Sequence, residues 1–242
     1  MEEKEIISEC IRIFELNNIE CAEDQARKLY ALTVRMLEVN KTMNLTAIKD
    51  EKAVILKHYV DSVTVSPHIP QNSKIIDIGC GAGFPSFPLA IFRSDLQITS
   101  LDGTAKRIAY VNETAKHLGL TNLNAISARA EELALTKEYR EQFDAVTARA
   151  VAALPILCEL CLPYVRQNGS FIAMKSKQAD DELLASRKCI EICGGGEARK
   201  ITLNLTSDNG ENEERSLIII KKISETPKNY PRHYSKISKK PL

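Results

Sequence analysis

The segment IIDIGCGAGFPSFPL, residues 75–89, constrains the fold of this chain more than any other feature. Its apolar run IIDI predicts a buried strand. Glycines follow at 79, 81 and 83, and glycine permits the positive φ angles of a tight turn and lets a ligand touch the backbone. A helix is expected next, with Pro85 at its first position, where no amide donor is needed. A strand, a glycine turn and a helix in this order predict a ligand site in an α/β fold.

The spacing of these glycines separates two ligand classes. A dinucleotide-binding turn has the pattern GxGxxG, and its third glycine would fall at the position of Phe84. The remaining pattern, DxGxGxG, is typical of a turn under the amino-acid end of S-adenosylmethionine, with Asp77 either accepting a hydrogen bond from the ligand's ammonium group or serving as a strand-end carboxylate. We therefore predict S-adenosylmethionine as the cofactor of a class I methyltransferase, and a nicotinamide dinucleotide is disfavoured.

Short apolar runs alternate with helical stretches beyond residue 74. KIIDIG, QITSLD, LNAISA, FDAVTARA and GSFIAMKS are strand-like, and helix-length stretches separate them, which predicts parallel strands with right-handed crossovers. The last two runs, RKITLNL and RSLIIIKK, are joined by the polar loop TSDNGENEE, which predicts a hairpin. The predicted fold class is α/β: a class I methyltransferase (Rossmann-like), mostly parallel seven-stranded sheet with an antiparallel C-terminal hairpin.

The chain on either side of this region differs in character. Residues 1–70 show helical patterns only and predict an N-terminal helical cap, followed by a cofactor-binding methyltransferase domain over residues 71–224. The tail, residues 225–242, is basic, rich in proline and without periodicity. It fits a flexible terminus or an RNA-contacting arm that neutralises phosphates and stacks on bases, and composition leaves both open.

Composition bounds the class of protein. The 242 residues are 44% hydrophobic and 27% charged, as in soluble globular proteins, and a net charge of +1 says little about partners. The start of the chain lacks the basic residues and apolar run of a signal peptide, and no apolar run approaches the ~18 residues of a membrane span. We expect a cytoplasmic monomer without a membrane partner.

The seven cysteines are expected to be reduced thiols, because the cytosol does not favour disulfides. Cys158 and Cys161 form a CxxC pair, and Cys189 and Cys193 a CxxxC pair, so a zinc site is an alternative. Zinc pairs usually sit in tight turns, whereas LPILCELCLPYV has the pattern of an apolar helix. Buried cysteines are therefore favoured, and no metal is predicted.

Polar residues follow the predicted strands at their carboxyl ends. Asp102 is placed to accept both ribose hydroxyls, or else to cap a helix. Ala130 and Glu131 are placed to reach the adenine edge, although Glu131 equally suits a solvated helix start. Arg149 stands where amino-group methyltransferases carry an Asn/Asp-Pro-Pro motif. The absence of that motif argues against exocyclic amine chemistry, and Arg149 suits a carboxylate or an RNA phosphate.

Several segments together resemble the RsmG (GidB) family, bacterial methyltransferases that modify a guanine at N7 in small-subunit ribosomal RNA. The matching segments are MNLTAIKD, KHYVDS, IIDIGCGAGFPSFPLA, LDGTAKR, ARAEE, TARAVA, AMKS and RSLIIIKK. The resemblance covers nearly the whole chain. The tail begins TPKNYPR, as in Gram-positive members, and then departs from their pattern, since HYSKISKKP lacks the expected glycine-proline turn.

The resemblance implies a set of site residues. Asn44 and Thr46 in MNLT, with His58 and Asp61 in KHYVDS, would lie in the cap and face the mouth of the cofactor site. Candidate substrate-orienting residues are Arg149, Lys175, Asn44 and His58, and no residue is assigned as a catalytic acid or base. The candidate cofactor contacts are Gly79, Gly81, Phe84, Asp102, Ala130, Glu131 and Arg149, with Gly81 and Asp102 added from the fold rather than from the resemblance.

The implied substrate is 16S rRNA or the small ribosomal subunit, which predicts a basic surface around the site. Guanine N7 carries a lone pair and no proton, so methyl transfer needs orientation and electrostatics but no general base. His58 is accordingly expected to pack or to form hydrogen bonds. The alternatives are a methyltransferase of this fold acting on a small molecule or a protein, and a non-catalytic ribosome-binding protein with a vestigial cofactor fold.

Overall fold

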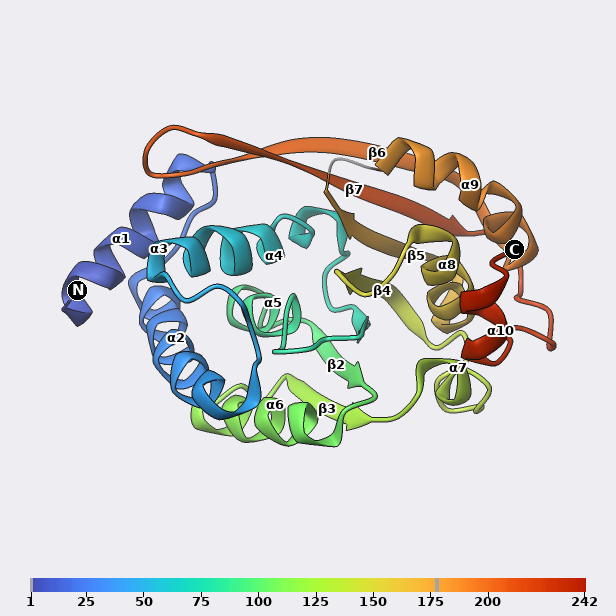
Figure 1. Ribbon diagram of the computed structural model, residues 1–242, viewed down its shortest axis with the longest axis horizontal. Coiled ribbons are helices and arrows are strands. Elements are labelled where there is room, and N and C mark those ends of the chain that lie inside the picture. Colours follow the sequence, from blue (N-terminus) through green and yellow to red (C-terminus); the bar gives the residue numbers. More distant parts are fainter. Residues whose placement is uncertain (1, 177–178) are drawn as a thin grey trace.

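A computed structural model describes residues 2–176 and 179–242, and its strands form one seven-stranded sheet in the order β3-β2-β1-β4-β5-β7-β6 (Figure 1). Strands β1 to β5 are parallel, and β7 runs antiparallel to both β5 and β6. The predicted sheet and hairpin are thereby confirmed. The strands are β1 (Lys74–Ile78), β2 (Gln97–Asp102), β3 (Leu123–Ser127), β4 (Phe143–Arg149), β5 (Val165–Lys175), β6 (Gly195–Thr206) and β7 (Asn212–Lys222).

Helices cover both faces of this sheet. On one face lie α1 to α6, and on the other α7 to α10. Figure 1 shows the blue N-terminal helices at one end of the molecule and α8, α9 and α10 at the other. The helical elements are α1 (Glu3–Leu16), α2 (Glu23–Met43), α3 (Glu51–Val54), η1 (Ile55–Val60), α4 (Asp61–Val63), η2 (Ser66–His68), α5 (Ser86–Phe92), α6 (Ala105–His117), α7 (Ala130–Leu133), α8 (Leu154–Cys161), η3 (Leu162–Tyr164), α9 (Ala179–Ile192) and α10 (Tyr234–Lys239).

Neighbouring residues of each central strand pack into opposite layers, because side chains alternate across a sheet. Ile75 belongs to the core cluster under the N-terminal helices, and Ile76 to the cluster under α8 and α9. Ala145 and Val146 of β4 divide in the same way. Strands buried on both faces are near-continuous apolar runs, as the sequence shows here. The N-terminal helices thus share a core with α5 and α6 rather than having one of their own.

The order of the strands determines where a ligand can bind. Strand β1 pairs with β2 on one side and with β4 on the other. The chain therefore reverses its direction of travel across the sheet between β1 and β4, and ligands of open α/β sheets bind outside the carboxyl ends of the strands at such a point. The glycine turn after β1 lies there.

The cysteines of the predicted CxxC and CxxxC pairs are buried free thiols. Cys158 and Cys161 lie in α8, in agreement with the apolar-helix interpretation. Burial raises the pKa of both thiols, whereas a zinc ligand must be a thiolate. Within residues 2–176 and 179–242, no group of three or more His, Cys, Asp or Glu side chains is arranged to hold a metal.

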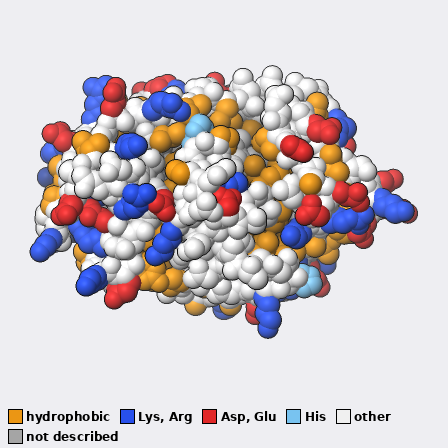
Figure 2. Space-filling view, turned by 180° about the vertical axis from the view of Figure 1, so that it is seen from behind, with side chains coloured by type: hydrophobic (Ala, Val, Ile, Leu, Met, Phe, Trp, Pro, Cys, Tyr) orange, Lys and Arg blue, Asp and Glu red, His pale blue; other side chains and the backbone are white. Residues whose placement is uncertain are grey.

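The surface was expected to carry a basic region for RNA. The face in Figure 2 shows Lys and Arg side chains interspersed with Asp and Glu, and they do not gather into one basic patch on that face. None of the helices in the described part of the chain is both long and apolar enough to cross a bilayer.

The C-terminal tail packs against the domain, so the flexible terminus left open by composition does not describe it. Arg232 donates from its backbone N, its Nε and its Nη2 to the carboxylate of Glu159, at 2.8, 2.8 and 2.6 Å. The Glu159 side chain is fully buried in α8, and Ile237 of α10 is buried in the same core. The tail is thus joined to the sheet domain by a buried ion pair and by an apolar contact.

This ion pair gives a stability prediction. Arg232→Met leaves the Glu159 carboxylate buried without its cation, and a broken buried pair typically costs about 3–5 kcal/mol. We expect urea unfolding of the variant to show a loss of that size. The double variant Glu159→Leu/Arg232→Met removes both charges and should recover most of the loss. A single variant as stable as the parent chain would show that the pair is not needed.

Candidate functional site

The glycine turn closes against the neighbouring strand β2. The amides of Gly79 and Cys80 both donate to the carbonyl oxygen of Leu101, at 2.7 and 3.0 Å. Gly79, Gly81 and Gly83 have φ angles of 75°, 56° and 90°, in the region that favours glycine. The turn therefore needs its glycines for backbone conformation, as the sequence predicts.

Asp77 lies beneath the turn and is fully buried. Its oxygens accept hydrogen bonds from Ser86 Oγ at 2.6 Å and from Thr147 Oγ1 at 3.2 Å, and Ser100 Oγ donates to Ser86 Oγ at 2.6 Å. The sequence left Asp77 open as a ligand contact or as a strand-end carboxylate. In the structure its hydrogen bond from Ser86 fixes the start of α5. Helix α5 begins at Ser86 with Pro85 as its N-cap, so the expected first helical position is wrong by one residue.

The burial of Asp77 predicts a pH dependence of stability. Burial raises the pKa of this carboxyl from 3.8 to about 6, so the folded protein holds the proton over a range where the unfolded chain has lost it. The contribution of the group is complete below the unfolded pKa and is lost as pH rises through the folded pKa, by about 3 kcal/mol in all. The free energy of unfolding of the parent chain should fall by that amount relative to Asp77→Asn between about pH 3.5 and pH 7. Parallel pH profiles for the two proteins in denaturant titrations would contradict this.

A cavity of about 330 Å³ lies at the carboxyl ends of β1, β2 and β3. We call it the turn cavity. It brings together four predicted cofactor contacts, Gly79, Asp102, Ala130 and Glu131. A fifth, Gly81, reaches it indirectly, because its amide donates to Asp102 Oδ2 at 3.1 Å.

Two carboxylates give the turn cavity its polar groups. Asp102 also accepts from the amide of Thr104 at 2.8 Å and lies 3.5 Å from the Arg107 guanidinium. Ionised carboxylates have about four acceptor sites, so capacity remains for further donors such as ligand hydroxyls. Glu131 is buried, with Arg129 Nε at 3.4 Å from its carboxylate, so it is not the solvated helix-start residue that the sequence left open.

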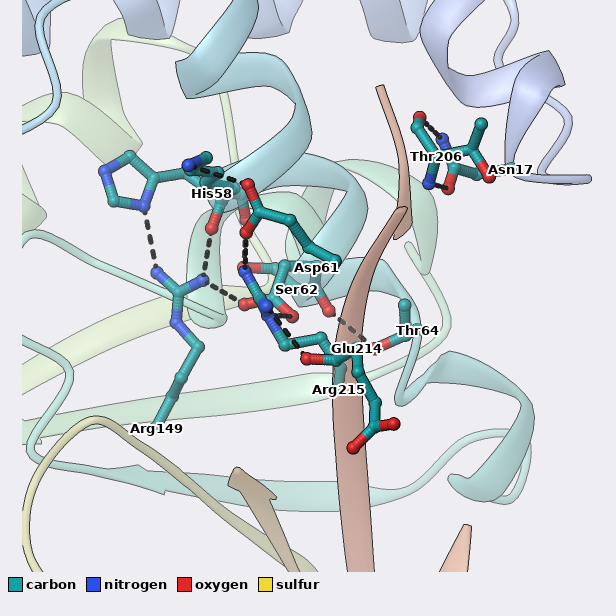
Figure 3. Close-up of polar contacts among 11 residues, drawn as sticks. Asn17, His58, Asp61, Ser62, Thr64, Arg149, Thr206, Glu214 and Arg215 are labelled. Atoms are coloured by element: carbon teal, nitrogen blue, oxygen red, sulfur yellow. Dashed lines mark hydrogen bonds and ion pairs between the residues drawn. The ribbon is translucent and has the colours of Figure 1, made fainter. Parts of the chain in front are cut away.

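A second cavity, of about 430 Å³, lies at the carboxyl ends of β4 and β5. We call it the arginine cavity, because Arg149 and Arg215 are among its lining residues. Figure 3 shows both side chains directed at Asp61 in the cap. Arg149 Nη1 donates to Asp61 Oδ2 at 2.8 Å, and Arg215 Nε lies 3.4 Å from Oδ1. The buried carboxylate thus joins the cap to both β4 and β7.

The remaining contacts of Arg149 also go to the cap. Its Nη1 donates to the carbonyl oxygen of Lys57 at 2.9 Å, and its Nη2 lies 3.1 Å from His58 Nδ1. Of the five N–H groups on a guanidinium, three donate to described residues, which leaves two without a partner in the described part of the chain. Arg149 does not line the turn cavity, so its predicted cofactor contact is not seen in the geometry of that cavity.

His58 joins the cap to the glycine turn. Its ring stacks on Phe84 with the centroids 4.6 Å apart, and its Nε2 lies 2.8 Å from Thr46 Oγ1. Burial, followed by the charge of Arg149, lowers the pKa of His58 to about 3. The ring is therefore neutral, Nδ1 accepts from Arg149 and Nε2–H donates to Thr46. Phe84, predicted as a cofactor contact, lines neither cavity and instead packs under the imidazole.

The segment between the two cavities is strained. Ala150 has a φ of 56°, and left-handed backbone costs a non-glycine residue about 1–2 kcal/mol. Arg149 and Ala150 line the arginine cavity, and Val151 lines the turn cavity. Neighbouring residues of this sharp turn thus line different cavities. Backbone strain of this kind is typical of functional sites.

The other two substrate-orienting candidates lie differently from expectation. Lys175 lines the arginine cavity, but its ammonium donates to the carbonyl oxygen of Ala152 at 2.8 Å and pairs with Glu182 at 2.6 Å. Asn44 is exposed at the end of α2 and does not line the cavity. Its neighbour Asn40 is buried instead.

Asn40 and Arg215 are residues that sequence reasoning missed. Asn40 donates to the carbonyl oxygen of Thr46 and accepts from its amide, both at 2.9 Å, and so holds the loop that presents Thr46 to His58. A polar residue on the buried face of a helical pattern was the available signal for Asn40. Arg215 gave no such signal, because its partner Asp61 is distant in the sequence.

Comparison with known proteins adds an independent observation. The family model described as GidB, rRNA small subunit methyltransferase G, matches residues 25–214. A ribosomal RNA small subunit methyltransferase G of Lactobacillus acidophilus is 40% identical over 230 residues, 93% of this chain and 95% of that protein. One of Desulforamulus reducens is 44% identical over 211 residues, 86% of each.

Solved structures support the fold. The O-methyltransferase from Bacillus cereus, in complex with SAH, aligns with a TM-score of 0.55 at 15% identity over 91% of this chain and 100% of that one. A putative O-methyltransferase from Klebsiella pneumoniae aligns with a TM-score of 0.52 at 18% identity, over 78% of this chain and 90% of that one. At such low identity the likeness concerns the fold alone.

Proposed function

This chain belongs to the GidB family of small-subunit rRNA methyltransferases, and from that membership we propose that it transfers a methyl group from S-adenosylmethionine to N7 of a guanine in 16S rRNA. The turn cavity takes the cofactor, and the arginine cavity takes the base. We also propose that the protein acts as a monomer in the cytoplasm. Buried free thiols suit a reducing compartment, and the exposed large apolar side chains are scattered over separate elements of the described chain rather than gathered for a partner.

The residues of the turn cavity fit S-adenosylmethionine. Asp102 has acceptor capacity for ribose hydroxyls, and Ala130 and Glu131 lie beyond it at the end of β3. A side chain at Gly79 would collide with Val151, since a Cβ there would come within 2.5 Å of it, so the backbone must stay bare at this point. When bound, S-adenosylmethionine supplies an electrophilic methyl group on a sulfonium.

The proposed acceptor atom is chosen because each side chain in the arginine cavity that could act as a general base already has a partner. Among the described residues that line it, Asp61 lies between two arginines and Glu182 is paired with Lys175. Both ring nitrogens of His58 are engaged. This lining offers no free base to remove a proton, which suits an acceptor such as guanine N7 that has a lone pair and no proton. The two unused N–H groups of Arg149 are available to orient the base.

Methylation of small ribosomal subunits tests the function. Small subunits from cells lacking this protein would be incubated with the chain and tritiated S-adenosylmethionine, and the rRNA digested to nucleosides. We expect label in N7-methylguanosine from 16S rRNA. Label confined to protein or small molecules would favour the alternative acceptors. Absence of cofactor binding at millimolar ligand would favour a non-catalytic ribosome-binding protein.

Arg149→Gln is the informative variant in this assay. It removes a cation from the buried Asp61 and the donors from the cavity, and charge-assisted hydrogen bonds are each worth about 1.5–3 kcal/mol. We expect kcat/KM for the subunit to fall at least about tenfold. Arg166→Gln is the matched control. Arg166, near the start of β5, pairs with Asp144 of β4, and neither residue lines either cavity. Equal losses in the two variants would remove the special role of Arg149.

The state of His58 predicts the pH profile of the reaction. Because its pKa is lowered to about 3, His58 stays neutral throughout the range in which histidines usually titrate. We expect the rate of methyl transfer at saturating cofactor to be flat between about pH 6 and pH 8. A rise with an apparent pKa near 6.5, absent in His58→Gln, would identify His58 as a base and contradict the proposal.

A further inference from the structure

The C-terminal helix α10 contributes a side chain to the wall of the turn cavity. Tyr234, the first residue of α10, lines this cavity together with Arg129, Ala130 and Glu131. The Arg129 guanidinium lies over the Tyr234 ring, with Cζ 5.2 Å from the ring centroid. Figure 1 shows α10 folded back beside α8 and near α7, far along the chain from the glycine turn. A residue from the tail thus completes a cavity built mainly by β1 to β3.

The position of Tyr234 is fixed by the docking of the tail. Two residues earlier, Arg232 forms the buried ion pair with Glu159, and three residues later Ile237 is buried in the core. Between them, His233 Nδ1 caps α10 by accepting from the amide of Ser235 at 3.3 Å. Arg140 Nη2 also donates to the carbonyl oxygen of Thr226 at 2.7 Å, where the tail begins. The ring is therefore held against the cavity from both directions along the chain.

We propose that Tyr234 and Arg129 form a stacking wall for the adenine ring of the cofactor, so that the C-terminal tail closes the cofactor site. The inference rests on the proposed function, since it assigns the adenine end to the side of the cavity formed by Ala130 and Glu131. Aromatic rings and arginine planes stack on purines through their π faces, without needing specific hydrogen bonds. Among the described residues, the Tyr234 hydroxyl has no hydrogen-bond partner, so its ring is the part of the side chain that acts.

The two halves of this wall come from different parts of the chain: Arg129 lies in the region that the family model matches, and Tyr234 lies in the tail. The family match ends at residue 214, so all of α10 lies beyond it. Part of the basic tail serves packing within the protein. Arg232 is paired with buried Glu159, and Tyr234 is half-buried. The remaining tail lysines of α10, Lys236 and Lys239, are exposed.

Calorimetric titration of the full chain with S-adenosylhomocysteine tests the wall. We expect Tyr234→Ala to raise the Kd about tenfold or more, since aromatic stacking on a base is worth about 1–3 kcal/mol. Tyr234→Leu keeps an apolar side chain for packing but lacks the π face, and should lose most of the same affinity. Tyr234→Phe keeps the ring and should bind within about twofold of the parent chain. Tyr30→Ala, at a half-buried tyrosine of α2 that does not line the cavity, is the matched control and should leave Kd unchanged.

Titration with adenosine locates the effect. Tyr234→Ala should weaken adenosine by the same factor as S-adenosylhomocysteine, because the lost contact is to the adenine. Unchanged affinity in Tyr234→Ala and Tyr234→Leu, with a parent chain that binds, overturns this inference and leaves the proposed function standing. If those variants instead lose affinity for small subunits, the tail is an RNA-contacting arm and the stacking wall is wrong. A parent chain that does not bind S-adenosylhomocysteine overturns the proposed function together with the wall.

Discussion

One buried carboxylate ties the cap to the sheet at the site. Asp61 lies between Arg149 of β4 and Arg215 of β7, so a single residue of the cap is tied to two strands that are distant in the sequence. A buried charge without its partner is costly, so arrangements of the cap that separate Asp61 from the arginines are disfavoured. The same contacts occupy part of the hydrogen-bonding capacity of Arg149 and place its guanidinium beside His58, whose ring stacks on Phe84 of the glycine turn. The Asp61 interaction therefore shapes the arginine cavity and links the cap to the glycine turn.

The two cavities differ in the groups that line them. The turn cavity has bare backbone at Gly79 and carboxylates that can accept from a sugar, while the arginine cavity has cations whose partners are already in place. They meet at the strained turn around Ala150. A methyl donor in one and an aromatic base in the other would approach each other across residues 149–151. In the proposed reaction the acceptor nitrogen has no proton to lose, so the protein has to supply orientation within a preorganised site.

The sequence predicted the sheet and the glycine turn, because apolar runs and glycine spacing are local signals. Four of its candidate cofactor contacts line the turn cavity together. Sequence reasoning failed where contacts join distant segments. Asp77 has the place of a ligand contact in the pattern, yet Ser86 and Thr147 cover it. Lys175 is a residue of a type that often binds phosphate, yet its ammonium is paired with Glu182. The tail showed only a basic composition, and its docking depends on Glu159, whose partner could not be read from an apolar helix.

The most direct measurement is the N7-methylguanosine content of 16S rRNA in cells that lack this protein and in the same cells complemented with the parent chain or with Asp61→Asn. The account predicts that the modification disappears on deletion and returns with the parent chain. It also predicts that Asp61→Asn, which weakens the tie between the cap and both arginines, restores little of it although the purified variant still binds S-adenosylhomocysteine. Unchanged N7-methylguanosine in the deleted cells would contradict the account.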